Sequence, residues 1–164
     1  MMGPEALGRL LDGHAGALTL YARQWCAVPD DVVQEAFIKL LGQRPAPDEP
    51  VAWLYRVVRN GAISASRGAR RRQRLETARA ATTPVWIEAT EEQRLDGDAV
   101  TAALQDLPIE QREAIVAHLW GGLTFEQIAR LAGSSSSTVH RHYAAGLVAL
   151  RERLKLPCPT KPAT

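Results

Sequence analysis

The sequence predicts an all-α protein made of two small helical domains joined by an acidic linker. Over most of the chain, apolar residues recur at spacings of three and four, which is the period of an amphipathic helix. Hydrophobic residues make up 46% of the chain and aromatic residues only 5%, a composition that can bury a core and favours helices over sheets. The periodicity fades between residues 76 and 99 and then returns, so we expect the linker there.

The first helices are predicted before and after a short break near Pro29. Apolar residues recur at helical spacing up to Trp25, which indicates one or two helices, with Gly13 and Gly16 loosening the middle. The run Pro29-Asp30-Asp31 predicts a helix start. An aspartate there can cap the free amides, and its charge suits the positive end of the helix dipole.

The helix that starts at Pro29 is expected to bury Leu40 and Leu41 and to stop near Gly42, before a proline-rich loop. A third helix is predicted from Val51 to Arg72, with Trp53 in its apolar stripe. From residue 56 to 79 the chain carries eight arginines and one acid, whereas from 88 to 113 it carries eight acids and two basic residues. Because a basic segment neutralises phosphates and an acidic one is repelled by DNA, the two segments should meet different partners.

Four more helices are predicted in the second half, over Val100–Leu107, Ile109–Trp120, Thr124–Ala132 and Ser135–Leu154. Thr124 and Gln127 fit a capping box. Gly133 can adopt the left-handed turn that ends a helix, and Ser135 can cap the next one. Two helices joined in this way form a helix-turn-helix, whose second helix lies in a major groove of DNA. The alternative is a helical hairpin with a serine-rich, solvated loop.

The predicted organisation is a first domain over residues 1–75, a linker over 76–99, a second domain over 100–156 and a flexible tail over 157–164. No cationic segment followed by an apolar run opens the chain, and no run of roughly 18 apolar residues occurs, so we expect neither a signal peptide nor membrane insertion. Cys26 and Cys158 are expected to be free thiols in a reducing compartment, which indicates a cytoplasmic protein.

Neither a metal nor a cofactor is expected. The four histidines lack companions at metal-ligand spacing, and no glycine-rich phosphate loop is present. No nucleophile with an adjacent base, and no pair of catalytic carboxylates, stands out, so an enzyme is the weakest interpretation.

The exposed face of the predicted recognition helix carries short polar and basic side chains. Hydroxyls near the helix start can reach phosphates, and His140 or Arg141 can reach base edges. The segments Leu107–Glu113 and Gly122–Ala129, followed by Thr138-Val139, resemble region 4 of sigma factors. The resemblance implies a domain that reads the −35 promoter element and contacts the polymerase β flap. The residues expected to bind −35 DNA are Ser136, Ser137, Thr138, His140, Arg141 and Ala144.

Two segments of the first domain carry a second resemblance. Residues 30–40 are similar to sigma region 2.2, which implies docking on the clamp helices of the polymerase β′ subunit through Asp31, Gln34, Glu35 and Lys39. Residues 52–60 are similar to sigma regions 2.3 and 2.4, which open the −10 element. Capture of a single strand needs cationic side chains and polar pockets. The residues expected to bind −10 DNA are Arg56, Arg59, Asn60 and Arg67.

With these two regions and no others, the chain is identified with the compact extracytoplasmic-function (ECF) group of the sigma-70 family. The resemblance implies a sigma factor that directs core RNA polymerase to promoters, by melting the −10 element and recognising the −35 element. Its partners are then core polymerase and promoter DNA, and the sequence leaves open an anti-sigma factor. Two other interpretations remain: a helix-turn-helix transcriptional regulator that does not deliver polymerase, and a sigma-like adaptor.

Overall fold

The structure, a computed structural model, describes residues 3–77 and 94–155, with side chains from residue 99 onward in the second range. Every regular element within these ranges is a helix, as predicted. The predicted flexible tail and most of the predicted acidic linker lie outside the described residues.

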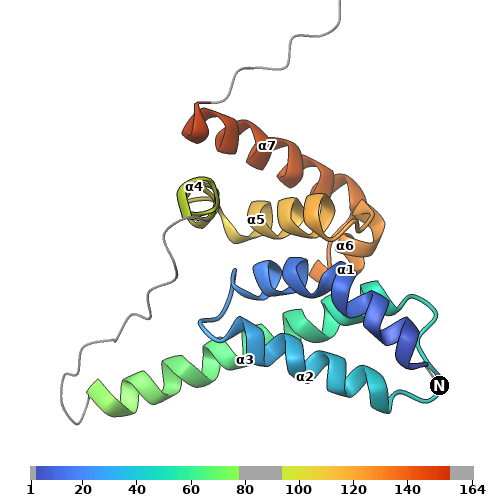
Figure 1. The fold of residues 1–164 in the computed structure, drawn as a ribbon. Helices are drawn as coiled ribbons and strands as arrows, with labels where there is room; N and C mark the ends of the chain where they lie inside the picture. Colours follow the sequence, from blue (N-terminus) through green and yellow to red (C-terminus); the bar gives the residue numbers. More distant parts are fainter. Residues whose placement is uncertain (1–2, 78–93, 156–164) are drawn as a thin grey trace, which may run out of the picture.

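The first half of the chain forms a bundle of three helices: α1 (Pro4–Ala22), α2 (Pro29–Gly42) and α3 (Pro50–Thr77). Each of the three helices packs against the other two (Figure 1). Their shared core contains Leu18, Phe37, Leu40, Leu54 and Val58, all at most 5% exposed. Burial of these apolar side chains is what holds the bundle together.

Helix α1 is one continuous helix through Gly13 and Gly16, which is one of the two predicted alternatives. One expectation for this bundle is wrong. Neither aspartate caps α2, because Pro29 occupies the first turn and Val28 stands at the cap position without a side-chain hydrogen bond. The fixed φ of proline is suited to the first helical position, so the start comes from Pro29. Asp30 and Asp31 lie in the first turn, where their charge still suits the helix dipole.

Helix α2 also buries a narrower face than predicted. Leu40 is 2% exposed, but Leu41 is 50% exposed, because the next residue of a helix lies about 100° further around its axis. Helix α3 is longer than predicted and runs five residues past Arg72 to Thr77. Its arginine-rich end extends beyond the other helices, and residues 69–77 are all exposed (Figure 1).

The second half comprises α4 (Arg94–Gln105), α5 (Ile109–Ile115), the π-helical η2 (Val116–Trp120), α6 (Phe125–Ala132) and α7 (Ser136–Leu154). Helices α4, α5 and α6 all pack against α7. Helix α4 starts at Arg94, inside the predicted linker, rather than at Val100. The predicted helix 109–120 changes to a π turn in its last five residues, in which the Gly121 amide donates to the Val116 carbonyl at 3.1 Å.

The two halves contact each other along α1 and α3. Helix α1 packs against η2, and α3 packs against α6. Figure 1 shows α1 between the rest of its bundle and the helices of the second half. The buried apolar residues of both halves form one continuous cluster. Residues far apart in the sequence therefore meet at this interface.

Candidate nucleic-acid interface

The helix-turn-helix is confirmed in its details. The Thr124 Oγ1 accepts a hydrogen bond from the Gln127 amide at 3.2 Å, and the Gln127 side chain accepts one from the Thr124 amide at 2.9 Å, which is the predicted capping box. Gly133 is left-handed, with φ 64° and ψ 40°. Ser135 caps α7 by accepting from the Thr138 amide at 3.2 Å. These local bonds satisfy amides at the start of both helices.

Side chains between α6, α7 and η2 fix how the motif sits in its domain. Ile128 and Val139 are buried between the two helices. His118 stacks on Phe125, with 4.4 Å between ring centroids, and its Nδ1 donates to the Leu123 carbonyl at 2.7 Å. His118 is therefore a structural residue of this domain.

The six residues predicted to bind −35 DNA lie on the free side of α7. All are exposed except Thr138, which is half-buried. Ser136, Ser137 and His140 line a pocket together with residues of α6, including Glu126. Hydroxyl, imidazole and guanidinium groups thus share the face that a major groove would meet.

The four residues predicted to bind polymerase are all exposed on α2. Lys39 Nζ lies 2.7 Å from Glu35 Oε1, an ion pair one helical turn apart. Beside them, Ile38 is 60% and Leu41 50% exposed. The sequence analysis did not include these two apolar side chains in the surface, although a helical wheel places Ile38 next to Gln34 and Glu35. The surface is therefore mixed polar and apolar, which suits a protein partner.

The residues predicted to bind −10 DNA do not share one environment. Asn60 lines a groove between α2 and α3 together with Asp31, Glu35 and Lys39. Arg67 is exposed further along α3. Arg56 is exposed beside a pocket against α6, and Arg59 is half-buried against α5. Two of the four therefore face the second domain.

Arg59 is held by a buried carboxylate of the second domain. Its Nε donates to Glu113 Oε1 at 2.6 Å, and a terminal nitrogen lies 3.4 Å from Glu113 Oε2. The Tyr21 hydroxyl of α1 donates to the same Oε1 at 2.7 Å. The Glu113 side chain is only 6% exposed and that of Arg59 23%. The Arg59 guanidinium also lies over the Trp25 ring, 5.8 Å from its centroid.

Burial and the neighbouring charges act on the ionisation of these groups. Burial raises the pKa of Tyr21 well above its ordinary value, and the charge and hydrogen bond of Glu113 add to this rise. Burial alone would lower the pKa of Arg59, but the hydrogen bond and charge of Glu113 outweigh it and raise the pKa. Arg59 is therefore fully charged, and Tyr21 is a neutral donor at neutral pH.

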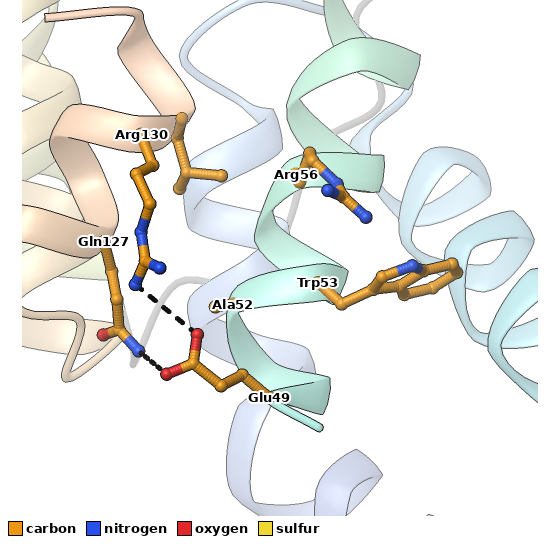
Figure 2. Close-up of a pocket in the computed structure, with 7 residues that line it drawn as sticks. Glu49, Ala52, Trp53, Arg56, Gln127 and Arg130 are labelled. Atoms are coloured by element: carbon orange, nitrogen blue, oxygen red, sulfur yellow. Dashed lines mark hydrogen bonds and ion pairs between the residues drawn. The ribbon is translucent and has the colours of Figure 1, made fainter. Parts of the chain in front are cut away.

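Glu49 makes a second polar contact between the halves, shown in Figure 2. It stands just before α3, and its carboxylate lies 3.3 Å from Gln127 Nε2 and 3.5 Å from an Arg130 nitrogen, both on α6. Arg56 and Trp53 lie on the adjoining turns of α3 and make neither contact. Trp53, expected in the core, is only partly buried, at the rim of this pocket.

A close packing contact between Tyr55 and Gly121 completes the interface between the halves. Tyr55 is fully buried, and its hydroxyl has no hydrogen-bond partner among the described residues. A Cβ on Gly121, the residue after η2, would lie 2.5 Å from that hydroxyl oxygen. Only glycine therefore allows this approach of η2 to α3.

The sequence analysis missed Tyr21, Glu49, Tyr55 and Glu113 as interface residues. Helical periodicity indicates which face of a helix is buried, but it does not indicate which other helix covers that face. One signal was present: Glu113 has apolar residues at helical spacing, with Ile109 four residues before it and Val116 three residues after it. A carboxylate at such a position needs a buried partner.

Some functions find no support in the described part of the chain. No group of three or more His, Cys, Asp or Glu side chains there could hold a metal ion. None of its helices is long and apolar enough to cross a membrane. Cys26 is a buried free thiol, whose pKa burial raises, and Cys158 lies outside the described residues.

A capped helix-turn-helix beside a second helical bundle with an arginine-rich helix defines a two-domain DNA-binding protein. Comparisons with known proteins agree with this class. Residues 8–72 match the family described as Sigma-70 region 2, and residues 97–150 match Sigma-70, region 4. The chain is 32% identical over 147 residues to the ECF RNA polymerase sigma factor SigL of Mycobacterium tuberculosis, and the match covers 82% of each chain.

Two solved structures have a similar fold. The sigma factor RpoE, determined in complex with the anti-sigma factor NepR from Bartonella quintana, matches with a TM-score of 0.70 and 24% identity, covering 95% of this chain and all of that one. CnrH, determined in complex with the cytosolic domain of CnrY, matches with a TM-score of 0.60 and 26% identity, covering 95% of this chain and 92% of that one.

The chain belongs to the ECF sigma factors of the sigma-70 family. It is a transcription initiation factor, and its partners are core RNA polymerase and promoter DNA. The regulator and adaptor interpretations are not favoured by these relatives.

Proposed function

We propose that this sigma factor binds polymerase, the −10 element and the −35 element through three separate surfaces. The α2 surface, formed by Asp31, Gln34, Glu35 and Lys39, binds the β′ clamp helices of core polymerase. This proposal is supported by the exposure of all four side chains and by the apolar Ile38 and Leu41 beside them. Exposed apolar groups rimmed by charges are typical of a protein interface.

The second surface lies on α3 and binds the −10 element through Arg56, Arg59, Asn60 and Arg67. Guanidinium groups neutralise the phosphates of the separated strand, and the Asn60 amide offers both a donor and an acceptor to an unpaired base. No hydrolysed nucleotide is needed, because binding to the open strand stabilises the opened state. The factor therefore acts without catalysis of its own.

The third surface is the free face of α7, which binds the −35 element through Ser136, Ser137, Thr138, His140, Arg141 and Ala144. The observation that carries the proposal is the capped helix-turn-helix with this face exposed. The domains responsible are residues 1–75 and 100–156. We further propose that the protein acts in the cytoplasm, where polymerase and promoters are found, and that an anti-sigma factor controls it, as one holds RpoE in a solved relative.

The −10 assignment is tested by charge reversal in reconstituted holoenzyme. Arg56→Glu with Arg59→Glu should abolish promoter opening, followed by permanganate reactivity of unpaired thymines, while the variant still co-purifies with core polymerase. The matched control reverses Arg9 and Arg23, two exposed arginines of the same domain. Equal loss of opening and core binding would show that these arginines have no specific role at the −10 element.

The −35 assignment is tested on duplex DNA. His140→Ala with Arg141→Ala should weaken promoter occupancy by about tenfold or more, because each good base contact contributes about 1–3 kcal/mol. Arg151→Ala, further along the same helix, is the control. Unchanged occupancy of the double variant would mean that another face of α7 meets the DNA.

A further inference from the structure

Tyr21 and Arg59 form an anion site, and the carboxylate of Glu113 in the same chain occupies it. Three donor nitrogens and oxygens converge on the Glu113 carboxylate: the Tyr21 hydroxyl, and the Nε and a terminal nitrogen of Arg59, at 2.7, 2.6 and 3.4 Å. All the donors belong to the first domain, and the carboxylate belongs to the second. Glu113 is therefore seated in the first domain in the way that a bound anion would be.

The donors would form a site for nucleic acid if the carboxylate were withdrawn. Arg59 pairs with phosphates as readily as with carboxylates, since its guanidinium fits both in the same planar geometry. Trp25 lies beneath Arg59 and edge-on to Tyr21, with 4.8 Å between their ring centroids, so an aromatic surface adjoins the anion site. Cationic and aromatic groups in this combination bind single-stranded nucleic acid.

The closed arrangement also carries a cost that favours its release. Tyr55 keeps its hydroxyl fully buried without a hydrogen-bond partner, directly against Gly121 of the second domain. Separation of the domains would expose this hydroxyl to water. The second polar contact, at Glu49, is exposed on both sides, so water competes for it. The Glu113 cluster is thus the main polar contact that opposes opening.

We propose that Glu113 is an internal mimic of a DNA phosphate, seated in an anion site made by Arg59, Tyr21 and Trp25, and that the site takes a phosphodiester of single-stranded DNA once the domains separate. Domain closure and strand binding then exclude each other, so the free factor binds single strands only weakly until another protein separates its domains. This inference rests on the proposed −10 role of α3, and it adds Tyr21 and Trp25 to that surface.

The test measures binding of the free, full-length protein to a fluorescent single-stranded oligonucleotide of mixed sequence, by anisotropy at fixed ionic strength. Glu113→Gln keeps the shape of the side chain but removes the charge, and it should bind at least about tenfold more tightly than wild type, because the competent state is more populated. Glu152→Gln is the matched control: an exposed acid of the second domain, on α7, whose side chain has no hydrogen bond or ion pair among the described residues. Equal affinities of the two variants would overturn the proposal.

Two further substitutions should each lower the affinity for the oligonucleotide. Tyr55→Phe removes the unpartnered hydroxyl and stabilises the closed state, so it should bind the oligonucleotide more weakly than wild type. Adding Tyr21→Phe to Glu113→Gln removes a donor of the anion site, so the double variant should lose part of the gain. No change in either comparison would contradict the assignment. Small-angle X-ray scattering should show a larger radius of gyration for Glu113→Gln only; a radius equal to that of wild type would also overturn the proposal.

Run-off transcription with core polymerase separates this inference from the proposed function. If wild type supports initiation but Glu113→Gln and Glu152→Gln bind the oligonucleotide alike, the sigma function stands and the internal mimic is wrong. If wild type supports no initiation, the proposed function itself is wrong.

Discussion

At the scale of single residues, Tyr21 reports on the contact between the domains through its ionisation. Burial and Glu113 raise the pKa of Tyr21 well above 10.0 in the folded protein, so the unfolded chain loses this proton at lower pH than the folded one. The stabilisation is therefore complete below pH 10 and declines as the pH rises beyond it. We expect the free energy of unfolding, measured by urea denaturation, to fall above that pH.

Tyr21→Phe should make this alkaline decline shallower, because it removes one of the two buried phenols. Tyr55 and Cys26, whose pKa values are also raised by burial, account for the decline that remains. Identical pH dependence in the variant and in wild type would show that Tyr21 is not buried beside a carboxylate in solution.

The two acids at the interface should differ in their effect on stability. Glu113→Ala leaves a half-buried guanidinium and a buried hydroxyl without their partner, and we expect it to lower the free energy of unfolding by up to about 3–5 kcal/mol. Glu49→Ala removes only an exposed pair and should cost less than about 1 kcal/mol. Chemical denaturation measures both. Equal losses would contradict the difference in burial that the structure gives these residues.

Residue exposure was largely predictable from the sequence, whereas residue partners were not. Helical period correctly predicted that the polar residues of α2 and the first turns of α7 are exposed. It could not indicate that Arg59 faces Glu113, 54 residues away, since that pairing depends on how two separately formed bundles meet. Arg59 was therefore predicted as a DNA contact only, and its tie to Glu113 was missed.

At the scale of secondary-structure elements, local side-chain bonds decide where helices start and end. The capping box and Gly133 were predictable because each acts within three or four residues. The π turn of η2 was not, because it accompanies the approach of Gly121 to Tyr55, a tertiary contact. The start of α4 was misplaced, because the helix extends back to Arg94, into an acidic segment that shows little apolar periodicity. The start of α2 at Pro29 was predicted, but its capping by an aspartate was not correct.

The capping box predicts the effect of a change at Thr124. Thr124→Ala removes the acceptor for the Gln127 amide and should lower the free energy of unfolding by about 1 kcal/mol. Thr124→Ser retains the acceptor and should stay within a few tenths of a kcal/mol of wild type. Thermal denaturation followed by circular dichroism compares them. Equal stability of the alanine and serine variants would mean that the cap does not stabilise α6.

At the scale of the whole molecule, the factor is two bundles in a closed arrangement that covers Arg59, part of the proposed −10 surface. The two-domain organisation was predictable from the fading of helical periodicity near residue 76 and from motif order. The closed arrangement was not, because it rests on a few contacts between α1, α3 and the second domain. If closure and strand binding exclude each other, as we propose, promoter opening must compete with closure.

The most direct test of this account is run-off transcription by core RNA polymerase with and without the purified protein, on a promoter selected from a random DNA pool. We expect a discrete transcript only when the protein is present, together with its co-purification with the core enzyme. A folded protein that neither associates with core polymerase nor starts a transcript would contradict the account.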